Sequence, residues 1–450
     1  MPAALSIQFL IIGGGVGAYA AALALRRVGH HVLVLEQRND GPLLAGSSRI
    51  PPNMSKILFG WGLEEECRSM AIVSRFVAMS NYFTGEVWGE HQWDEEILKE
   101  TRGVFLLMHQ TDVRDLLKKT AIALGAVVRR NATIVGFDLE DEDKLPGVLL
   151  ADGETLRANV IIGADGRPSM VRELAFAVQD PRKACHLVVF DVTVPISEML
   201  KDPELTEFLG DSVMLCICGD RHAVLSNPVG GLPEYSMHII VPNDGSFHPS
   251  SREWIKEVSA SQILQAMGPC DSRLVKLINM SHSRICAKML KQFEVEDWVH
   301  PDANAVLIGG AAHPFHAGAV YSRSMAVEDA ACLAELFSHL SHLDQISDFL
   351  NAFQEIRQPR CTEIRQMEEV IMHTMTMSDE EAEARDAHMK EAVDDGKGIM
   401  SYLGFDQLVA MFAYEAEDAA NNWWVTWGVV KERMRNDRKR SLYGFAFVAT

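Results

Sequence analysis

Residues 7–36 read IQFLIIGGGVGAYAAALALRRVGHHVLVLE, and they have the pattern of a βαβ unit. A short apolar run rich in β-branched residues indicates a strand over residues 7–12. Apolar residues at helical spacing then predict a helix from Val16 to Val28, followed by a glycine. Residues 31–36 form a second apolar strand that ends in Glu36. Strand, glycine turn, helix and strand in this order are typical of α/β nucleotide-binding folds.

The turn in this unit is a GxGxxG-type sequence, GGGVGA at residues 13–18. Gly13 allows the tight turn, and Gly15 lets the backbone approach a pyrophosphate at the helix N-terminus. The third position needs only a small side chain for helix–strand packing, which Ala18 supplies. Glu36 can accept hydrogen bonds from the ribose hydroxyls of adenosine. The alternative is a glycine turn with nothing bound, but the surrounding pattern favours nucleotide binding.

The whole chain is long and acidic. Its 450 residues contain 42 Lys and Arg against 62 Asp and Glu, a formal net charge of −20. The length predicts more than one lobe, and the negative charge argues against binding of nucleic acid. The long apolar run at residues 4–26 is interrupted by glycines, so we expect no transmembrane segment. Eight cysteines without metal-type spacing favour a reduced, cytoplasmic protein without a metal site.

Four further motifs follow the glycine turn in a fixed order. They are GADG at residues 163–166, GGAAHP at 309–314, VEDA at 327–330 and FQEIRQPR at 353–360. Together with the turn they resemble the class A flavoprotein monooxygenases, the aromatic hydroxylases and epoxidases that include salicylate and 4-hydroxybenzoate hydroxylase. The resemblance extends from residue 7 to about residue 365.

The resemblance implies FAD as the cofactor and NADPH as its reductant. It implies cofactor-binding roles for Asp165, Gly309 and Gly310, which stand in the second and third motifs. It also implies a small hydrophobic substrate, an aromatic, polyketide or terpenoid metabolite. We expect the chain to act as a monomer or homodimer.

Downstream patterns complete the predicted fold. Apolar segments separated by Pro, Gly and Asn turns predict a mostly antiparallel sheet within residues 180–290. We therefore predict an α/β fold with a Rossmann-like FAD-binding domain, an inserted mostly antiparallel β-sheet substrate domain and C-terminal helices. The predicted boundaries are residues 1–75, 100–175 and 289–345 for the FAD-binding domain, 76–99 for an excursion into the substrate lobe, 176–288 for the substrate domain and 346–450 for the helical region.

The chain departs from the family pattern on the flavin side. Gly310 replaces an aspartate that binds the ribityl chain. Gln110 replaces an arginine, and we expect it to remain one of the cofactor-binding residues. Ala317 replaces a proline beside the isoalloxazine ring. Val320 and Ser322 replace two glycines that let backbone amides approach the pyrimidine ring, and valine adds β-branched bulk there. The adenosine half of the predicted site keeps its residues.

The same segment introduces titratable side chains. His313 and His316 can exchange protons near neutral pH, Tyr321 can donate to a developing oxyanion, and Arg323 adds a positive charge. These four are candidate catalytic residues. The alternative is that His313 caps the turn while His316 and Tyr321 fill space left by the ring. Arg49 is a candidate cofactor-binding residue because its charge could replace the missing arginine.

Three functions stay open from the sequence. The first is an FAD-dependent monooxygenase that hydroxylates or epoxidises its substrate. The second is a flavin-independent enzyme on the same fold that catalyses a cyclisation, isomerisation or dehydration in natural-product biosynthesis by acid–base chemistry. The third is a catalytically silent partner subunit that uses the acidic helix at residues 379–395 as an interface. The intact glycine turn favours the first.

Overall fold

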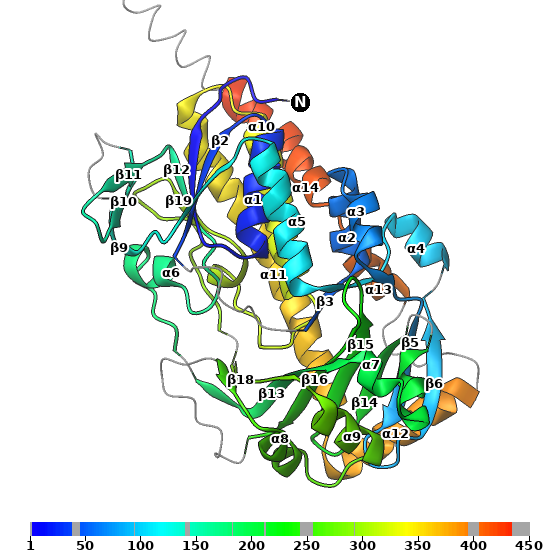
Figure 1. Ribbon diagram of the computed structural model, residues 1–450. Coiled ribbons are helices and arrows are strands. Elements are labelled where there is room, and N and C mark those ends of the chain that lie inside the picture. The colour runs from blue at the N-terminus through cyan, green and yellow to red at the C-terminus, as the bar shows by residue number, and fades with distance from the viewer. Residues whose placement is uncertain are drawn as a thin grey trace, which may run out of the picture.

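Two sheet-containing layers make up the molecule, and a long helix connects them (Figure 1). The upper layer in Figure 1 holds a parallel sheet with helices beside it, and the lower layer holds a larger sheet. Helix α11 (Ile346–Met375) runs from one layer to the other. The predicted fold class is therefore confirmed. The computed structural model describes residues 2–37, 46–93, 95–139, 145–181, 183–210, 213–243, 255–291, 293–394 and 405–433.

The parallel sheet is built around the first strand of the chain. Its order is β19 (Ala305–Leu307), β12 (Val160–Gly163), β1 (Gln8–Ile12), β2 (His31–Glu36) and β8 (Val127–Arg130), and every neighbouring pair is parallel. Parallel sheets are covered on both faces, which requires continuous apolar strands. Accordingly, residues 9–12 are at most 3% exposed.

Helix α1 (Val16–Arg27) packs between two other helices through small side chains. Residues 18–25 are buried, and five of these eight are alanine. These small residues let α10 (Ser322–Ser338) approach closely, because a Cβ placed on Gly17 would lie 3.2 Å from the Cβ of Ala326. Helix α5 (Gln110–Ala123) also packs against α1.

The lower layer is an eight-stranded sheet. Its order is β17 (Ile255–Glu257), β18 (Ser283–Leu290), β13 (Ala184–Pro195), β16 (Glu234–Pro242), β15 (Ala223–Val229), β14 (Val213–Cys218), β5 (Phe76–Asn81) and β6 (Val87–Gln92). All neighbouring pairs are antiparallel except β14 and β5, which are parallel. Strands β5 and β6 come from the first hundred residues, so an early segment of the chain completes the sheet.

The two faces of this sheet have different surroundings. One face carries Val188, Phe190 and Val192, which pack in an apolar cluster with side chains of α8 (Ala260–Met267) and α9 (Ser272–Met280). Side chains alternate between the faces of a strand, so Asp191 points to the other side. That side faces the nucleotide-binding layer, because Arg49 of β3 (Ser47–Ile50) donates to the carbonyl of Leu225. It is the face on which a polar site is found.

The remaining elements surround these two sheets. Strands β3, β7 (Leu106–His109) and β4 (Ile72–Val73) form one small sheet, and β11 (Thr155–Arg157), β10 (Gly147–Leu150) and β9 (Ile134–Asp138) form another. The shorter helices are α2 (Pro52–Gly60), α3 (Glu64–Ser69), α4 (Glu95–Thr101), α6 (Met170–Ala175), α7 (Ile196–Met199), α12 (Asp379–Asp394), α13 (Phe405–Phe412) and α14 (Ala416–Trp423), with 3₁₀ turns at Pro203–Leu209, Gly309–Ala311 and Leu343–Gln345 and a π-turn at Trp424–Gly428. No helix in the described part of the chain is long and apolar enough to cross a membrane.

A buried ion network joins α10 to α11. Arg357 of α11 is fully buried, and its guanidinium lies 2.8 Å from the carboxylate of Glu328 and 2.9 Å from that of Asp329. A buried charge is tolerated only when it is paired and hydrogen-bonded. The network therefore fixes the position of α11 relative to the N-terminal part of α10.

Replacing Arg357 tests this network. We expect Arg357→Ala to lower the free energy of unfolding by about 3–5 kcal/mol, because two buried carboxylates lose their shared cation. Urea unfolding followed by circular dichroism measures the change. The control is Lys201→Ala, which breaks the exposed ion pair with Glu198 and should cost less than about 1 kcal/mol. Equal losses in the two variants would contradict the network's role.

Candidate functional site

The glycine turn has the geometry that a phosphate-binding turn requires. Gly13 has φ +135°, and a Cβ there would lie 2.3 Å from the carbonyl oxygen of Ala164, so only glycine fits. Gly15 is the N-cap of α1, and a Cβ on it would meet nothing within 4 Å. The backbone at the N-terminus of α1 is thus open on the side where an anionic group binds. Ala18 is fully buried, as its packing role predicts.

Glu36 lies beside this turn. Its carboxylate accepts a 2.9 Å hydrogen bond from the hydroxyl of Tyr19, and the ammonium of Lys118 is 3.6 Å away. The other carboxylate oxygen faces the turn, because a Cβ on Gly14 would lie 2.2 Å from it. Tyr19 and Lys118 thus fix the orientation of the Glu36 carboxylate beside the turn. Burial, together with the carboxylate of Glu36, raises the pKa of Tyr19, so its hydroxyl keeps the proton that it donates.

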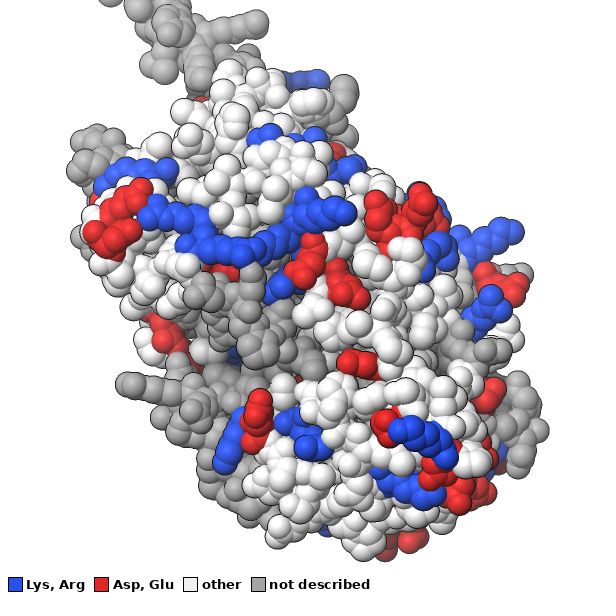
Figure 2. Space-filling view, in the orientation of Figure 1, with Lys and Arg blue, Asp and Glu red and all other residues white. Residues whose placement is uncertain are grey.

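The charge around the turn differs from that of the whole chain. Figure 2 shows Lys and Arg side chains in a row across the upper layer, from the β9–β11 sheet toward α5. Helix α5 and strand β8 contribute basic residues to this layer, among them Lys118, Lys119, Arg129 and Arg130. A local positive field attracts phosphate even when the net charge is negative.

Asp165 is directed into the protein. Its carboxylate accepts hydrogen bonds from the hydroxyl of Ser169 at 2.6 Å and from the backbone N–H of Met170 at 2.7 Å and of Val171 at 3.1 Å. Burial raises the pKa of Asp165, and these donors oppose the shift. The side chain therefore caps the start of α6, and its predicted contact with the cofactor stays a prediction.

Gly309, Gly310 and His313 form a tight turn after β19. Gly309 has φ +58°, and its N–H donates to Asp329 at 2.9 Å. A Cβ on Gly310 would lie 3.3 Å from the Cα of Gly166, so the two glycine-containing turns are in backbone contact. An aspartate at position 310 would have to displace that contact.

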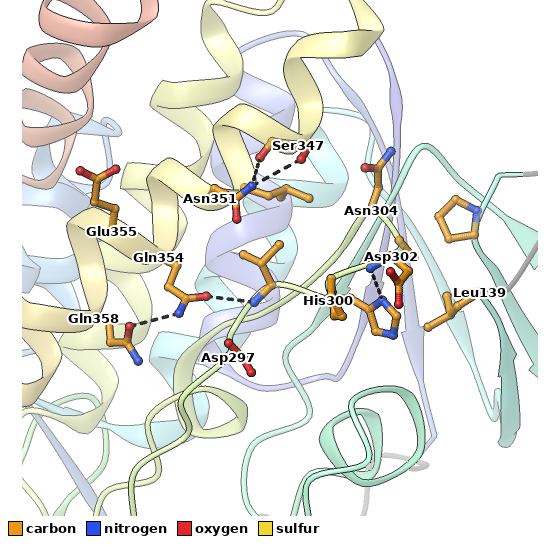
Figure 3. Close-up of a pocket in the computed structure, with 15 residues that line it drawn as sticks. Leu139, Asp297, His300, Asp302, Asn304, Ser347, Asn351, Gln354, Glu355 and Gln358 are labelled. Carbon is orange, nitrogen blue, oxygen red and sulfur yellow. Dashed lines mark hydrogen bonds between the residues drawn. The ribbon is translucent and has the colours of Figure 1, made fainter. Parts of the chain in front are cut away.

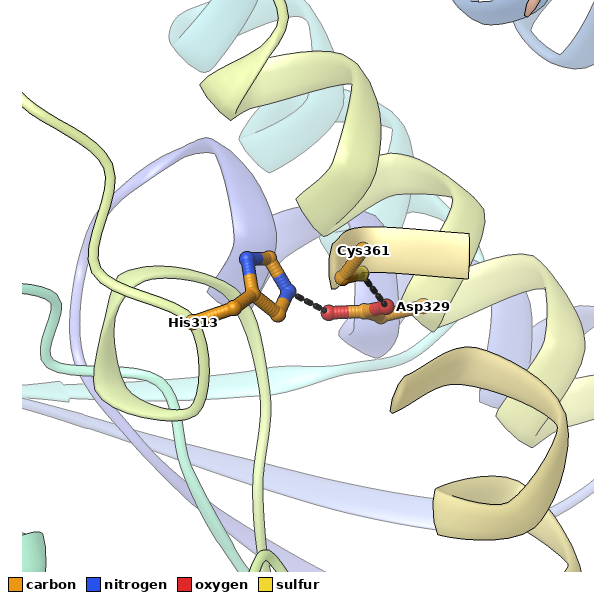
Figure 4. A group of neighbouring side chains, drawn as sticks. All are labelled: His313, Asp329 and Cys361. Carbon is orange, nitrogen blue, oxygen red and sulfur yellow. Dashed lines mark hydrogen bonds and ion pairs between the residues drawn. The ribbon is translucent and has the colours of Figure 1, made fainter. Parts of the chain in front are cut away.

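His313 belongs to a buried group with Asp329 and Cys361 (Figure 4). Its Nε2 is 2.6 Å from Asp329 Oδ2, and Cys361 Sγ is 4.0 Å from Asp329 Oδ1. Burial opposes a charge on the imidazole, but Cys361 and Asp329 outweigh it and raise the pKa of His313 to about 10. Because Arg357 and the N–H of Gly309 already bind Asp329, we assign this group to stabilisation of the turn.

A second polar cluster lies at the N-terminus of α10. The carboxylate of Glu368, from α11, accepts a 2.6 Å hydrogen bond from the N–H of Tyr321 and a further bond from the N–H of Val320. Glu368 is 2% exposed, and burial raises its pKa. The carboxylate thus binds the N–H of the N-cap residue Tyr321 and that of Val320 just before it, at the point where α10 begins.

Further polar and charged side chains lie in this region. The Nε2 of His316 lies 4.0 Å from it and has no hydrogen-bond partner among the described residues. Arg323 donates to the amide oxygen of Gln110 at 2.8 Å. Arg49 is 4% exposed, and burial lowers its pKa to about 10. Arg49, Arg323 and His316, predicted from the sequence as site residues, are thus brought to one region of the interface between the layers.

The sheet completes the cluster from below. Asp191 of β13 and His238 of β16 are register partners whose side chains are in contact, and Asp191 lies near Arg49 and Arg323. Sequence reasoning missed this pair, and it also missed Tyr19 and Glu368.

Two pockets are relevant to the site: one includes His316 of the polar cluster, and the other lies at an edge of the parallel sheet. A pocket of about 330 Å³ lies between the ends of β13 and β18 and helix α11, and His316 forms part of its wall together with Leu187, Met289 and Met372. A larger pocket of about 740 Å³ has polar walls, among them Gln354, Gln358 and Asn351 (Figure 3). Asn304 of that pocket precedes β19, so the larger pocket lies at the amino-terminal edge of the sheet, opposite the glycine turn.

The fold and this site define a class: dinucleotide-binding α/β proteins with an inserted sheet lobe. Comparison with known families agrees, because the model of the FAD binding domain family matches residues 6–368. The chain belongs to this family, and the resemblance to class A monooxygenases is confirmed.

Individual relatives are distant but cover most of the chain. The FAD-dependent monooxygenase OpS4 of Beauveria bassiana is 24% identical over 80% of this chain and 83% of its own. The 3-hydroxybenzoate 6-hydroxylase 1 of Aquipseudomonas alcaligenes is 26% identical over 73% of this chain and 79% of its own. Among solved structures, CtdE in complex with FAD and a substrate has a TM-score of 0.77 at 17% identity, covering 94% of this chain and 98% of that one.

The assignment of His313 predicts how stability changes with pH. Its folded pKa of about 10 exceeds the ordinary value of 6.5, so the stabilisation is complete below pH 6.5 and is lost as pH rises toward 10. We expect the free energy of unfolding to fall between pH 7 and pH 9.5, by at most about 1.4 kcal/mol per pH unit. His313→Gln should flatten this slope in urea unfolding, whereas His186→Gln, an exposed control, should not. Identical slopes in all three proteins would refute the assignment.

Proposed function

We propose that this protein is an FAD-dependent monooxygenase that hydroxylates or epoxidises a small aromatic, polyketide or terpenoid metabolite. The observation that carries the proposal is the open N-terminus of α1 at Gly15, with Glu36 oriented beside it. The names of the relatives agree with this activity, since OpS4 and 3-hydroxybenzoate 6-hydroxylase 1 are monooxygenases or hydroxylases. The proposal includes a cytoplasmic location and action as a monomer or homodimer.

The two halves of the cofactor fit the chain differently. The adenosine diphosphate half fits, because the α1 N-terminus can bind the pyrophosphate and Glu36 the ribose. The ring half does not fit the chain as it stands: the N–H groups of Val320 and Tyr321, at the family's pyrimidine site, already bind Glu368. When bound, FAD would supply the oxygen-activating chemistry, with NADPH as its reductant.

The chain's own contribution is to bind the substrate and exclude water. The pocket beside His316 has apolar walls from Leu187, Met289, Leu290 and Met372, which suit a small hydrophobic molecule. Its volume of about 330 Å³ lies at the lower end of the range for small-molecule sites. Arg49 and Arg323 lie in the adjoining cluster, where they can orient an acidic or carbonyl oxygen.

Blocking the glycine turn tests the adenosine half. Gly15→Val should leave the fold intact, because a Cβ at this position meets nothing within 4 Å, but should weaken FAD binding at least about tenfold by filling the pyrophosphate position. Quenching of flavin fluorescence measures the affinity. Gly60→Val is the matched control, since a Cβ there also meets nothing within 4 Å. Unchanged affinity in Gly15→Val would remove the nucleotide site from the turn.

The visible spectrum of the purified protein tests the activity. Bound flavin together with substrate-stimulated oxidation of NADPH is the expected result. A colourless protein that takes up no flavin from solution would overturn the proposal.

A second candidate function rests on the cluster itself. Glu368 and His316 are buried titratable groups about 4.0 Å apart, and Arg49 is close enough to affect the pKa of Glu368. Such a set can move a proton without any redox cofactor. Under this alternative, the protein is a flavin-independent catalyst of a cyclisation, isomerisation or dehydration.

Product mass distinguishes the two functions. Monooxygenation adds one oxygen atom, whereas isomerisation and cyclisation leave the mass unchanged and dehydration removes one water. If the flavin-stripped protein converts a panel of polyketides and terpenoids, His316→Ala or Tyr321→Phe should reduce the rate at least about tenfold while the circular dichroism spectrum is unchanged. Mass spectrometry measures the conversion. Full rates in both variants would exclude these residues from proton transfer.

A further inference from the structure

Two helices begin at the same edge of the parallel sheet. Helix α1 follows β1 after the glycine turn, and α10 follows β19 after a longer connection at residues 308–321; both strands run in the same direction. The helices therefore start at the carboxyl-terminal edge of the sheet, and the contact between Gly17 and Ala326 places the first turn of α1 beside the second turn of α10. An elongated ligand with an acceptor group at each end can bind both N-termini at once.

The N-termini of α1 and α10 differ in whether a side chain of the protein binds them. The start of α1 is open at Gly15, whereas the start of α10 is bound by Glu368. This carboxylate comes from α11, 47 residues away from Tyr321 along the chain, and it is almost fully buried. Taking a carboxylate out of water is costly, so this contact is maintained by the N–H groups and by the nearby cations.

We infer that Glu368 is an internal ligand of the α10 N-terminus that excludes the ring end of FAD from it. The inference rests on the proposed binding of FAD through its adenosine half. A flavin pyrimidine ring offers carbonyl oxygens, and these and the Glu368 carboxylate require the same N–H groups. The ring end therefore binds α10 only when Glu368 is displaced.

Substitutions elsewhere in the cluster agree with an internal ligand. Val320 places a β-branched side chain where close approach of a ring needs glycine. Gln110 accepts a hydrogen bond from Arg323, so these two side chains bind each other. Arg49 and His316 supply positive or polarisable groups near the Glu368 carboxylate. These features agree with a site whose groups bind one another and Glu368 rather than a ring.

Three variants on α11 test the inference by binding alone. Glu368→Ala frees both N–H groups and should bind FAD at least about tenfold more tightly than the unchanged protein, by fluorescence titration. Its affinity for ADP should be unchanged, because ADP reaches only the α1 end. Glu363→Ala removes the same charge from an exposed position five residues earlier on α11, outside the pocket, and should change neither affinity. Glu368→Gln keeps an acceptor but loses the charge, so its gain should be at least about threefold.

Several results would overturn the inference. They are equal FAD affinity in Glu368→Ala and the unchanged protein, an equal gain for ADP and FAD, or no FAD binding in any variant. If Glu368→Ala does not fold, judged by circular dichroism, Glu368→Gln decides instead. An FAD affinity of Glu368→Gln equal to that of the unchanged protein would then overturn the inference. Tight FAD binding and NADPH oxidation that are the same with and without Glu368 would refute the inference and leave the proposed function standing. A gain of flavin only on removal of Glu368 supports the inference and contradicts the proposed function.

Discussion

The buried pairing of Arg357 with Glu328 and Asp329 is the interaction on which the site depends. It connects α11 to α10 inside the protein, where an unpaired charge would be costly. Asp329 also binds the N–H of Gly309 and the imidazole of His313, so the same network fixes the turn after β19. Glu368 lies three helical turns beyond Arg357 on the same helix. Because Arg357 holds α11 against α10, the side chain of Glu368 can bind the N–H of Tyr321 where α10 begins.

The two ends of the proposed nucleotide site are supported separately. The adenosine end depends on β1, α1 and β2, which are contiguous in sequence, and on Lys118 from α5. The ring end depends on α10 and α11 and on the facing strands of the eight-stranded sheet. Substitutions at one end need not disturb the other. This separation explains how the glycine turn keeps its geometry while Val320, Gln110 and Glu368 fill the opposite end with internal contacts.

The sequence predicted those parts that local patterns determine. The strands at β1 and β2, helix α1 and the glycine turn follow from periodicity and from the steric needs of Gly13 and Gly15 over thirty residues. The eight-stranded sheet was predicted in type, but the parallel pairing of β14 with β5 was not, because it joins segments more than a hundred residues apart. The role of Glu368 was not predicted for the same reason, because its contact with Tyr321 also joins residues far apart in the sequence. A glutamate in a charged helix has no local pattern that marks it as a cap for another helix.

The position of Glu368 makes the two candidate functions mutually exclusive at this site. Acid–base chemistry requires the carboxylate where it is, next to His316 and on the N–H groups of α10. Flavin chemistry at the family's ring position requires the same carboxylate to leave those groups. The backbone of α11 is held by Arg357, so departure means rotation of the Glu368 side chain rather than movement of the helix. A buried carboxylate that rotates away needs other donors, and Arg49 is the neighbouring cation that has an unpaired Nε within the described part of the chain. The choice between the two chemistries therefore depends on whether the N-terminus of α10 or the guanidinium of Arg49 binds this carboxylate more strongly.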